Sequence, residues 1–209
     1  MLSKWLIVAL LLALASVALW PAATAQQGGT PSVIINEISW AGTAASATDE
    51  WIELYNTTNY EVDLTGWMLS WEGRTIHFDR AADDTKEVRN SKIPARGFYL
   101  LERTDDTTIS DLPADLIYSG SLANEGEALV LRDERDVIID TANSDGGNWP
   151  AGTDARTEVP YATMERIRSA GGDVDGNWAS NNGKTRNGLD AKGNPLNGTP
   201  KETNSAAAS

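Results

Sequence analysis

The stretch VIINEISWAGTAASATDEWIELYNTTNYEVDLTGWMLS, which runs from Val33 to Ser70, decides the fold of this chain. Its first run, Val33–Ser39, is rich in β-branched residues and is followed by a turn at Gly42. A second run, residues 50–56, distributes its side chains over two faces with the two-residue period of a strand. Both runs therefore predict short β-strands. The faces of the second strand are expected to hold Trp51, Glu53 and Tyr55 on one side and Ile52 and Leu54 on the other.

Strand-like runs continue along the chain, separated by Gly, Asn, Asp and Pro. No segment after residue 25 shows a sustained 3.6-residue apolar period, so helices are not expected. The charged segment 79–92 is predicted to be a loop, segment 143–160 to cover one end of the fold, and the chain after Gly171 to run irregularly over the surface. Many short strands with frequent turns predict an all-β, two-sheet sandwich. The further expected strands are 66–72, 74–78, 98–102, 127–132, 137–141 and, as the last one, 162–167.

The first 25 residues have the features of a secretory signal peptide. Lys4 precedes an uncharged run rich in Leu, Ala and Val, and Ala23-Thr24-Ala25 places small residues where a signal peptidase cleaves. The apolar run is short for a membrane span, which needs about 20 apolar residues. The alternative is an uncleaved anchor that tethers the domain. The expected organisation is a signal peptide over 1–25, a polar spacer over 26–32, the sandwich domain over 33–204 and a disordered tail over 205–209.

The composition restricts the classes of partner and of chemistry. The sequence contains 30 acidic and 17 basic residues, a formal net charge of −13. Cleavage after Ala25 removes one lysine and no acid, which brings the net charge to −14. Such a surface repels phosphate backbones, so nucleic acid is not an expected partner. The sequence has no cysteine, which excludes disulfides, thiolate catalysis and cysteine-ligated zinc, so the core alone must hold the fold.

A succession of short motifs is similar to one known family. Asn36-Glu37-Ile38 is followed by EWIELYN at residues 50–56 and by DLTGW at residues 63–67. This order closely resembles the opening of bacterial lamin tail domains of the secreted type. Lys201 stands where a glycine is common in that family, so the resemblance does not predict the conformation of the final turn. The later landmarks that resemble the family are 93–101, 122–131, Gly198-Thr199-Pro200 and Asn204.

The resemblance implies an immunoglobulin-like β-sandwich over nearly the whole chain after the signal segment. Lamin tails of animal nuclei bind proteins and chromatin, and bacterial relatives are exported, often beside hydrolase domains. Fold by itself does not fix function. The expected function is a non-catalytic interaction or adhesion module, secreted or at the cell surface, that binds a protein or a polysaccharide. Contact with a membrane is expected only if the signal segment stays uncleaved, and no catalytic residue is assigned.

Three tryptophans are the candidate ligand-binding residues. Trp71, Trp149 and Trp178 lie close to Gly, Asn or charged residues, so they are expected to be partly exposed. Exposed aromatic side chains can stack on sugar rings, and tryptophan is enriched at protein interfaces. The competing interpretation is that these side chains belong to the core or cap its ends.

The first alternative function is a small extracellular hydrolase. Glu37 and Glu53 lie on strands expected to be close together, and two carboxyl groups facing a cleft can act as acid and base. His77, the only histidine, could serve as a base oriented by Asp79. The structural interpretation is favoured for both, because buried carboxyl groups and histidines more often accept or donate hydrogen bonds within a fold.

The second alternative is a structural cell-surface protein stiffened by calcium. Asp173, Asp175 and Asn177 place oxygen atoms two residues apart, as in the first part of a calcium loop. The sixth position of such a loop requires glycine and the twelfth a glutamate, but Trp178 and Lys184 stand there. A turn built on Asp, Asn and Gly is therefore favoured, and no other cofactor is expected.

Overall fold

The computed structural model describes residues 29–207. The predicted signal peptide, the first residues of the polar spacer and residues 208–209 lie outside the described residues. Within 29–207 the elements are β-strands and one turn of 3-10 helix, η1 (Asp175–Asn177), which agrees with the all-β prediction. No helix in this part of the chain is long and apolar enough to cross a membrane.

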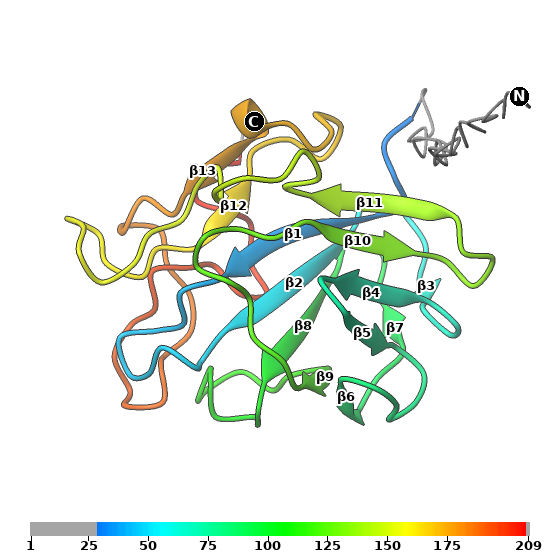
Figure 1. Cartoon of the computed structure of the whole chain (residues 1–209), viewed down its shortest axis with the longest axis horizontal. Coiled ribbons are helices and arrows are strands. Elements are labelled where there is room, and N and C mark those ends of the chain that lie inside the picture. The colour runs from blue at the N-terminus through cyan, green and yellow to red at the C-terminus, as the bar shows by residue number, and fades with distance from the viewer. Residues whose placement is uncertain (1–28, 208–209) are drawn as a thin grey trace, which may run out of the picture.

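Two sheets face each other and form a sandwich (Figure 1). Neighbouring strands are antiparallel, except that β8 and β9 are parallel. The larger sheet has the order β13 (Trp178–Ser180), β12 (Met164–Arg166), β1 (Val33–Ser39), β2 (Trp51–Asn56), β8 (Phe98–Arg103), β9 (Leu116–Tyr118) and β6 (Thr85–Val88). The smaller sheet has the order β11 (Ile138–Ala142), β10 (Leu129–Arg132), β4 (Met68–Trp71) and β5 (Arg74–His77). A two-stranded ribbon joins β3 (Val62–Asp63) to β7 (Lys92–Ile93).

The main core fills the space between the two sheets. On β2, Ile52 and Leu54 enter this core, whereas Trp51 belongs to a separate cluster on the opposite face, which confirms the predicted two faces of that strand. Leu69 on β4 and Leu131 on β10 meet them from the smaller sheet. Each such fully buried side chain contributes roughly 1.5–3 kcal/mol, so apolar burial stabilises this cysteine-free fold without disulfides.

A β-bulge in β1 decides which side chains face outward. The register between β1 and β2 shifts between Ile35 and Glu37, so that Asn36 is the additional residue. Ile35 and Ile38 consequently both enter the main core, while the intervening polar side chains face away from it. The backbone N–H of Ile35 donates to Asp140 Oδ2 at 2.8 Å, which ties the bulge to β11 of the smaller sheet.

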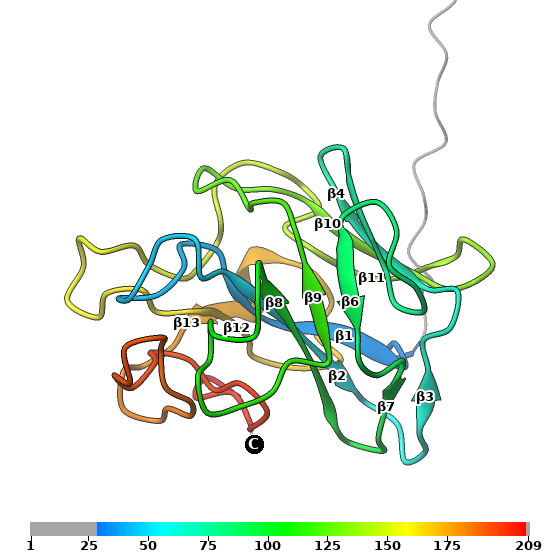
Figure 2. The same ribbon diagram turned by 90° about the horizontal axis from the view of Figure 1, so that it is seen from below.

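A third layer covers the outer face of the larger sheet. The segment 181–207, orange to red in Figure 2, runs across the side of this sheet that faces away from β4, β10 and β11. Trp51 and Leu100 of the sheet pack there against Ile109 and Leu196 and form a second, smaller core. Apart from β13, the carboxyl-terminal segment has the irregular path predicted for the chain after Gly171, and it packs on the sheet through Leu196.

The sequence interpretation missed five short strands. The predicted loop 79–92 contains β6 and begins β7, β13 follows the strand that was predicted to be the last one, and β3 and β9 were also missed. These elements have two to four residues each, too few to show a two-residue period. The strand β6 (TKEV) is moreover an edge strand with exposed charged side chains, so its sequence resembles a loop.

Candidate functional site

Three glutamates form a row across the outer face of the larger sheet. In the strand register, Glu37 of β1 lies opposite Glu165 of β12 on one side and opposite Glu53 of β2 on the other. All three side chains are fully buried beneath the third layer. Glu37 and Glu53 were predicted to lie close together, whereas Glu165 was not predicted, because the pairing of β12 with β1 is not visible in the sequence.

Glu37 binds the third layer at Thr199. Its Oε1 accepts hydrogen bonds from the Thr163 hydroxyl at 2.5 Å and from the Thr199 N–H at 2.8 Å, and its Oε2 accepts one from the Thr199 hydroxyl at 2.9 Å. A Cβ on Gly198 would come within 3.0 Å of Glu37 Oε1 and 2.9 Å of Trp51. Glycine at 198 therefore lets the backbone approach the carboxyl group closely.

Glu53 binds the third layer at Lys201, two residues further along the chain. Its Oε1 accepts a hydrogen bond from the Asn36 amide at 3.0 Å, and its Oε2 accepts one from the Lys201 N–H at 2.5 Å. Lys201 has a positive φ of 61°, a conformation that favours glycine. Here the lysine ammonium pairs with Asp115 at 2.8 Å, and this contact offsets part of the backbone strain.

Glu165 holds the end of the described chain. Its Oε1 accepts a hydrogen bond from the Asn181 amide at 2.6 Å, and its Oε2 accepts from the Ser205 hydroxyl at 2.7 Å and the Ala206 N–H at 2.9 Å. The prediction that the tail is disordered over 205–209 is therefore wrong at its start, because Ser205 and Ala206 are bound to a buried carboxyl group.

One hydroxyl, that of Thr199, lies between two carboxyl groups of the glutamate row. The Thr199 hydroxyl lies 2.9 Å from Glu37 Oε2 and 3.2 Å from Glu165 Oε1, but its single proton serves only one of these contacts. The other contact is a hydrogen bond only when a carboxyl group carries a proton. Burial, followed by the charge of Glu165, raises the pKa of Glu37 to about 8. Burial and the charge of Glu37 raise the pKa of Glu53 well above its ordinary value.

The two glutamates of the hydrolase alternative do not face a cleft. Glu37 and Glu53 lie under residues 198–206, and their oxygen atoms already accept hydrogen bonds from that segment. A substrate would reach them only after the third layer had left the sheet. Their geometry fits the structural interpretation, in which carboxyl groups anchor a backbone.

His77 on β5 is also held by structural contacts. The Nη2 group of Arg80 lies 3.0 Å from Nδ1, and because arginine only donates, Nδ1 accepts and the proton sits on Nε2. Nε2–H then donates to Asp83 at 2.8 Å. Asp79, the predicted orienting carboxylate, instead accepts from the Gly66 N–H and from Arg80. Among the described residues, the ring has no hydrogen bond to a serine.

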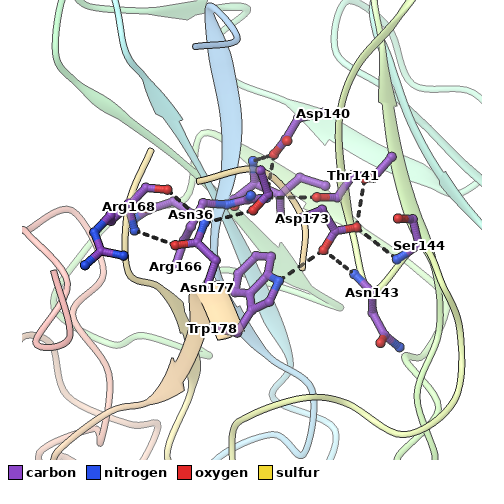
Figure 3. A network of polar contacts seen from close by, with 12 residues as sticks. Asn36, Asp140, Thr141, Asn143, Ser144, Arg166, Arg168, Asp173, Asn177 and Trp178 are labelled. Carbon is purple, nitrogen blue, oxygen red and sulfur yellow. Dashed lines mark hydrogen bonds and ion pairs between the residues drawn. The ribbon is translucent and has the colours of Figure 1, made fainter. Parts of the chain in front are cut away.

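The calcium candidate Asp173 is surrounded by hydrogen-bond donors (Figure 3). Its oxygen atoms accept from the Thr141 hydroxyl at 2.8 Å, the Asn143 and Ser144 N–H groups at 2.9 Å, and the Trp178 indole at 3.0 Å. Burial raises the pKa of Asp173, but the hydrogen bonds from Ser144, Thr141 and Trp178 outweigh it and keep this pKa below its ordinary value. The charge of this carboxylate is therefore stabilised by the protein itself.

The other two calcium candidates do not converge with Asp173 on one point. The Asn177 side chain accepts from the Arg168 N–H at 3.0 Å and donates to the carbonyls of Arg168 and Gly172, while Asp175 is exposed. Within residues 29–207, no group of three or more His, Cys, Asp or Glu side chains is gathered in a way that could hold a metal ion. The geometry supports the favoured interpretation, a turn that is fixed by its own side chains.

We expect the melting temperature to be the same in calcium and in a chelator, because a cation stabilises only when it binds the native state more tightly than the unfolded state. The measurement is differential scanning calorimetry of the mature domain in excess calcium and in excess EDTA at one ionic strength. A melting temperature that rises with the calcium concentration, and loses this rise in Asp173→Asn, would restore calcium to this turn.

A buried ion pair connects this turn to the bulge of β1. Arg166 Nη2 contacts Asp140 Oδ2 at 2.7 Å and the Thr141 carbonyl at 2.8 Å, and Arg166 Nε donates to the Ile35 carbonyl at 2.9 Å (Figure 3). The guanidinium carbon lies 4.3 Å from the centre of the Trp178 ring. This network joins both sheets, and it leaves the buried Nη1 of Arg166 without a hydrogen-bond partner.

The three candidate tryptophans are buried, which corrects the expectation of partial exposure. The exposed fractions of Trp71, Trp149 and Trp178 are 3%, 8% and 5%. Each indole N–H is satisfied, by the Ser121 carbonyl at 3.1 Å, the Ala123 carbonyl at 2.7 Å and Asp173 at 3.0 Å. They form no exposed patch, and the carbonyls that bind Trp71 and Trp149 come from the segment between β9 and β10.

The structure instead places a cavity of about 450 Å³ on the outer face of the larger sheet. We call it the outer cavity. It lies where β1, β2 and β8 meet the loop after β12 and the carboxyl-terminal segment, and its volume is in the ~300–1,000 Å³ range of ligand pockets. Its principal lining residues are Ile34, Tyr55, Arg96, Phe98, Arg168 and Thr203.

Sequence analysis missed the outer cavity because strand register creates it. Tyr55 and Phe98 stand opposite each other in the pairing of β2 with β8, and their ring centres are 5.1 Å apart. They lie more than 40 residues apart in the sequence, and Arg168 reaches the same place from a third segment. The alternation of β2 did indicate that Tyr55 faces away from the main core, which was the one available signal.

The chain matches one known protein family. The model of the family described as Lamin Tail Domain matches residues 26–145, which include the strands β1 to β11. No curated protein matches the chain. The matched part supplies Tyr55, Arg96 and Phe98 of the outer cavity, and the following part supplies Arg168 and Thr203.

Proposed function

The chain belongs to the lamin tail domain family, and from this premise we propose that it is an exported, non-catalytic module that binds a protein or a polysaccharide through the outer cavity. Lamin tail domains are non-catalytic, immunoglobulin-like domains, which agrees with the sandwich seen here. The signal-peptide pattern of residues 1–25 supports export to the cell surface or the medium.

One observation carries the proposal. The groups that the sequence offered for chemistry are bound to other parts of the fold, whereas the outer cavity keeps polar groups without partners. The hydroxyls of Tyr55, Ser169 and Thr203 line it, and among the described residues none of them has a hydrogen-bond partner within the chain. Open polar groups beside an aromatic floor are the usual composition of a binding site.

The test is a binding array on which the mature domain is presented with polysaccharides and with extracellular proteins. Ala170 lines the outer cavity and is exposed, so Ala170→Trp would fill the cavity without removing a hydrogen bond. Ala191 is equally exposed and lies outside the cavity, so Ala191→Trp is the matched control. We expect wild type and Ala191→Trp to bind the same ligands and Ala170→Trp to lose them. An array that stays blank, or binding that survives Ala170→Trp, would reject this function for the cavity.

A further inference from the structure

The outer cavity differs in charge from the rest of the molecule. The chain has 30 acidic residues, but none of them lines this cavity. Three arginines do: Arg166, which is buried and paired with Asp140, and Arg96 and Arg168, whose side chains are exposed. A local excess of positive charge in an acidic protein favours an anionic group at this position over the surrounding surface.

The two guanidinium groups are free to bind an anion. Eight arginines form ion pairs with carboxylates of the chain, and in residues 29–207 the three that form none are Arg96, Arg168 and Arg186. Two of these three meet at one cavity. Since most arginines in this acidic chain find a carboxylate, this pair is available for a carboxylate from outside.

The backbone holds both arginines in place. Arg96 adopts a positive φ of 56° in the turn before β8, and its Nε donates to Asn59 at 3.0 Å, which leaves both terminal nitrogens unused. The backbone of Arg168 is fixed on both sides by the Asn177 amide, at 3.0 Å and 2.9 Å (Figure 3). The fold thus fixes the backbone of both arginines before a ligand arrives, which lowers the entropic cost of binding.

The floor and walls of the cavity are suited to a sugar ring. Tyr55 and Phe98 are half-buried and tilted by 39° to each other, so they offer ring faces on which the C–H groups of a sugar can pack. The unpartnered hydroxyls of Tyr55, Ser169 and Thr203 match the hydroxyls of a sugar, each of which both donates and accepts. Arginine clusters also recognise acidic peptide motifs, and the aromatic pair beside three open hydroxyls is what favours a sugar in this cavity.

We infer that the outer cavity binds a carboxylate-bearing sugar, that is, a uronic acid unit of an acidic polysaccharide. In this arrangement Arg96 and Arg168 donate to the sugar carboxylate, a geometry that guanidinium groups satisfy with two parallel hydrogen bonds. Tyr55 and Phe98 pack against the ring, and the free hydroxyls bind its hydroxyl groups. The inference rests on the proposed function, because it names the ligand of the same cavity.

The test is calorimetric titration of the mature domain with a trimer of galacturonic acid and with the methyl ester of the same trimer. The ester keeps the shape and loses the charge, so we expect it to bind at least about tenfold more weakly. Arg96→Gln and Arg168→Gln should each weaken binding of the trimer by a similar factor. Arg186→Gln removes an equally unpaired arginine away from the cavity and should bind like wild type. Melting curves of the four proteins verify that each variant is folded.

The outcomes separate this inference from the proposed function. Equal binding of the acid and the ester, or unchanged binding in Arg96→Gln and Arg168→Gln, overturns the carboxylate recognition and leaves a polysaccharide-binding cavity. If the domain binds inorganic phosphate or an acidic peptide but neither trimer, the assignment of a sugar as the ligand is wrong. If the cavity variants change the binding of none of these probes and of no array ligand, both the inference and the proposed function are wrong.

Discussion

Replacing Arg166 by methionine is expected to lower the free energy of unfolding by roughly 3–5 kcal/mol, the cost of removing one partner from a buried ion pair. The side chains of Arg166 and Asp140 are only 1% and 5% exposed, and the pair is 2.7 Å long. Without the guanidinium group, Asp140 would remain buried with one hydrogen bond from Ile35 in place of an ionic partner. The Ile35 and Thr141 carbonyls would also lose their donor.

Urea denaturation followed by tryptophan fluorescence measures this loss, and Arg156→Met provides the matched control. The Arg156 side chain is 88% exposed and pairs with Asp154, so its replacement should change the free energy of unfolding far less than that of Arg166. Replacement of both Arg166 and Asp140 by neutral residues should cost less than the two separate losses combined, because the charge left unpaired in each single variant is absent. A loss from Arg166→Met no larger than that from Arg156→Met would show that the pair does not stabilise the sandwich.

The stability of the domain is expected to fall as the pH rises from about 4.5 to about 8. The pKa of Glu37 is raised to about 8 by burial and by the charge of Glu165, whereas in the unfolded chain it returns to about 4.5. Between these values the folded state binds the proton and the unfolded state does not, so the stabilisation present below pH 4.5 is lost as the pH approaches 8. Each unit of pKa shift corresponds to about 1.4 kcal/mol, so the change is on the order of a few kcal/mol.

Glu37→Gln isolates this effect, because glutamine has the shape of a protonated glutamate. Its oxygen can accept from Thr163 and from the Thr199 N–H, and its amide can donate to the Thr199 hydroxyl. We expect the variant and wild type to be about equally stable near pH 4.5, and the variant to be more stable by a few kcal/mol above pH 8. Glu202→Gln, at an exposed position outside the glutamate row, is the matched control. A variant that is less stable than wild type at pH 8 would show that Glu37 is ionised in the folded protein.

The sequence predicted correctly those elements that display a complete period or motif. The strands around Ile52 and Leu54, the turns at glycine and the family resemblance were all visible in the first 70 residues, because strand alternation is a local property. The short strands β3 and β7 were missed, because two residues show no period and their pairing depends on segments about 30 residues apart.

The interpretation of Glu37 and Glu53 as structural was favoured from the sequence, but the reason for it was not available there. Thr199, Lys201 and Ser205 arrive from the far end of the chain, and only their contacts reveal what the glutamates hold. The exposure of the tryptophans was predicted wrongly for a related reason. Neighbouring polar residues indicate a loop, but they do not show whether that loop folds back over the indole.

By itself, the sequence determined the all-β class, the immunoglobulin-like family and the two faces of β2, because these follow from side-chain periodicity and from motifs of consecutive residues. Only the tertiary structure decided that the glutamates anchor a third layer and that Tyr55, Phe98, Arg96 and Arg168 surround one cavity. Sheet register and the path of the final segment bring these groups together, and both are set by packing between residues far apart in the chain. The site proposed for a carboxylate-bearing sugar is therefore a property of the folded domain that no single stretch of its sequence contains.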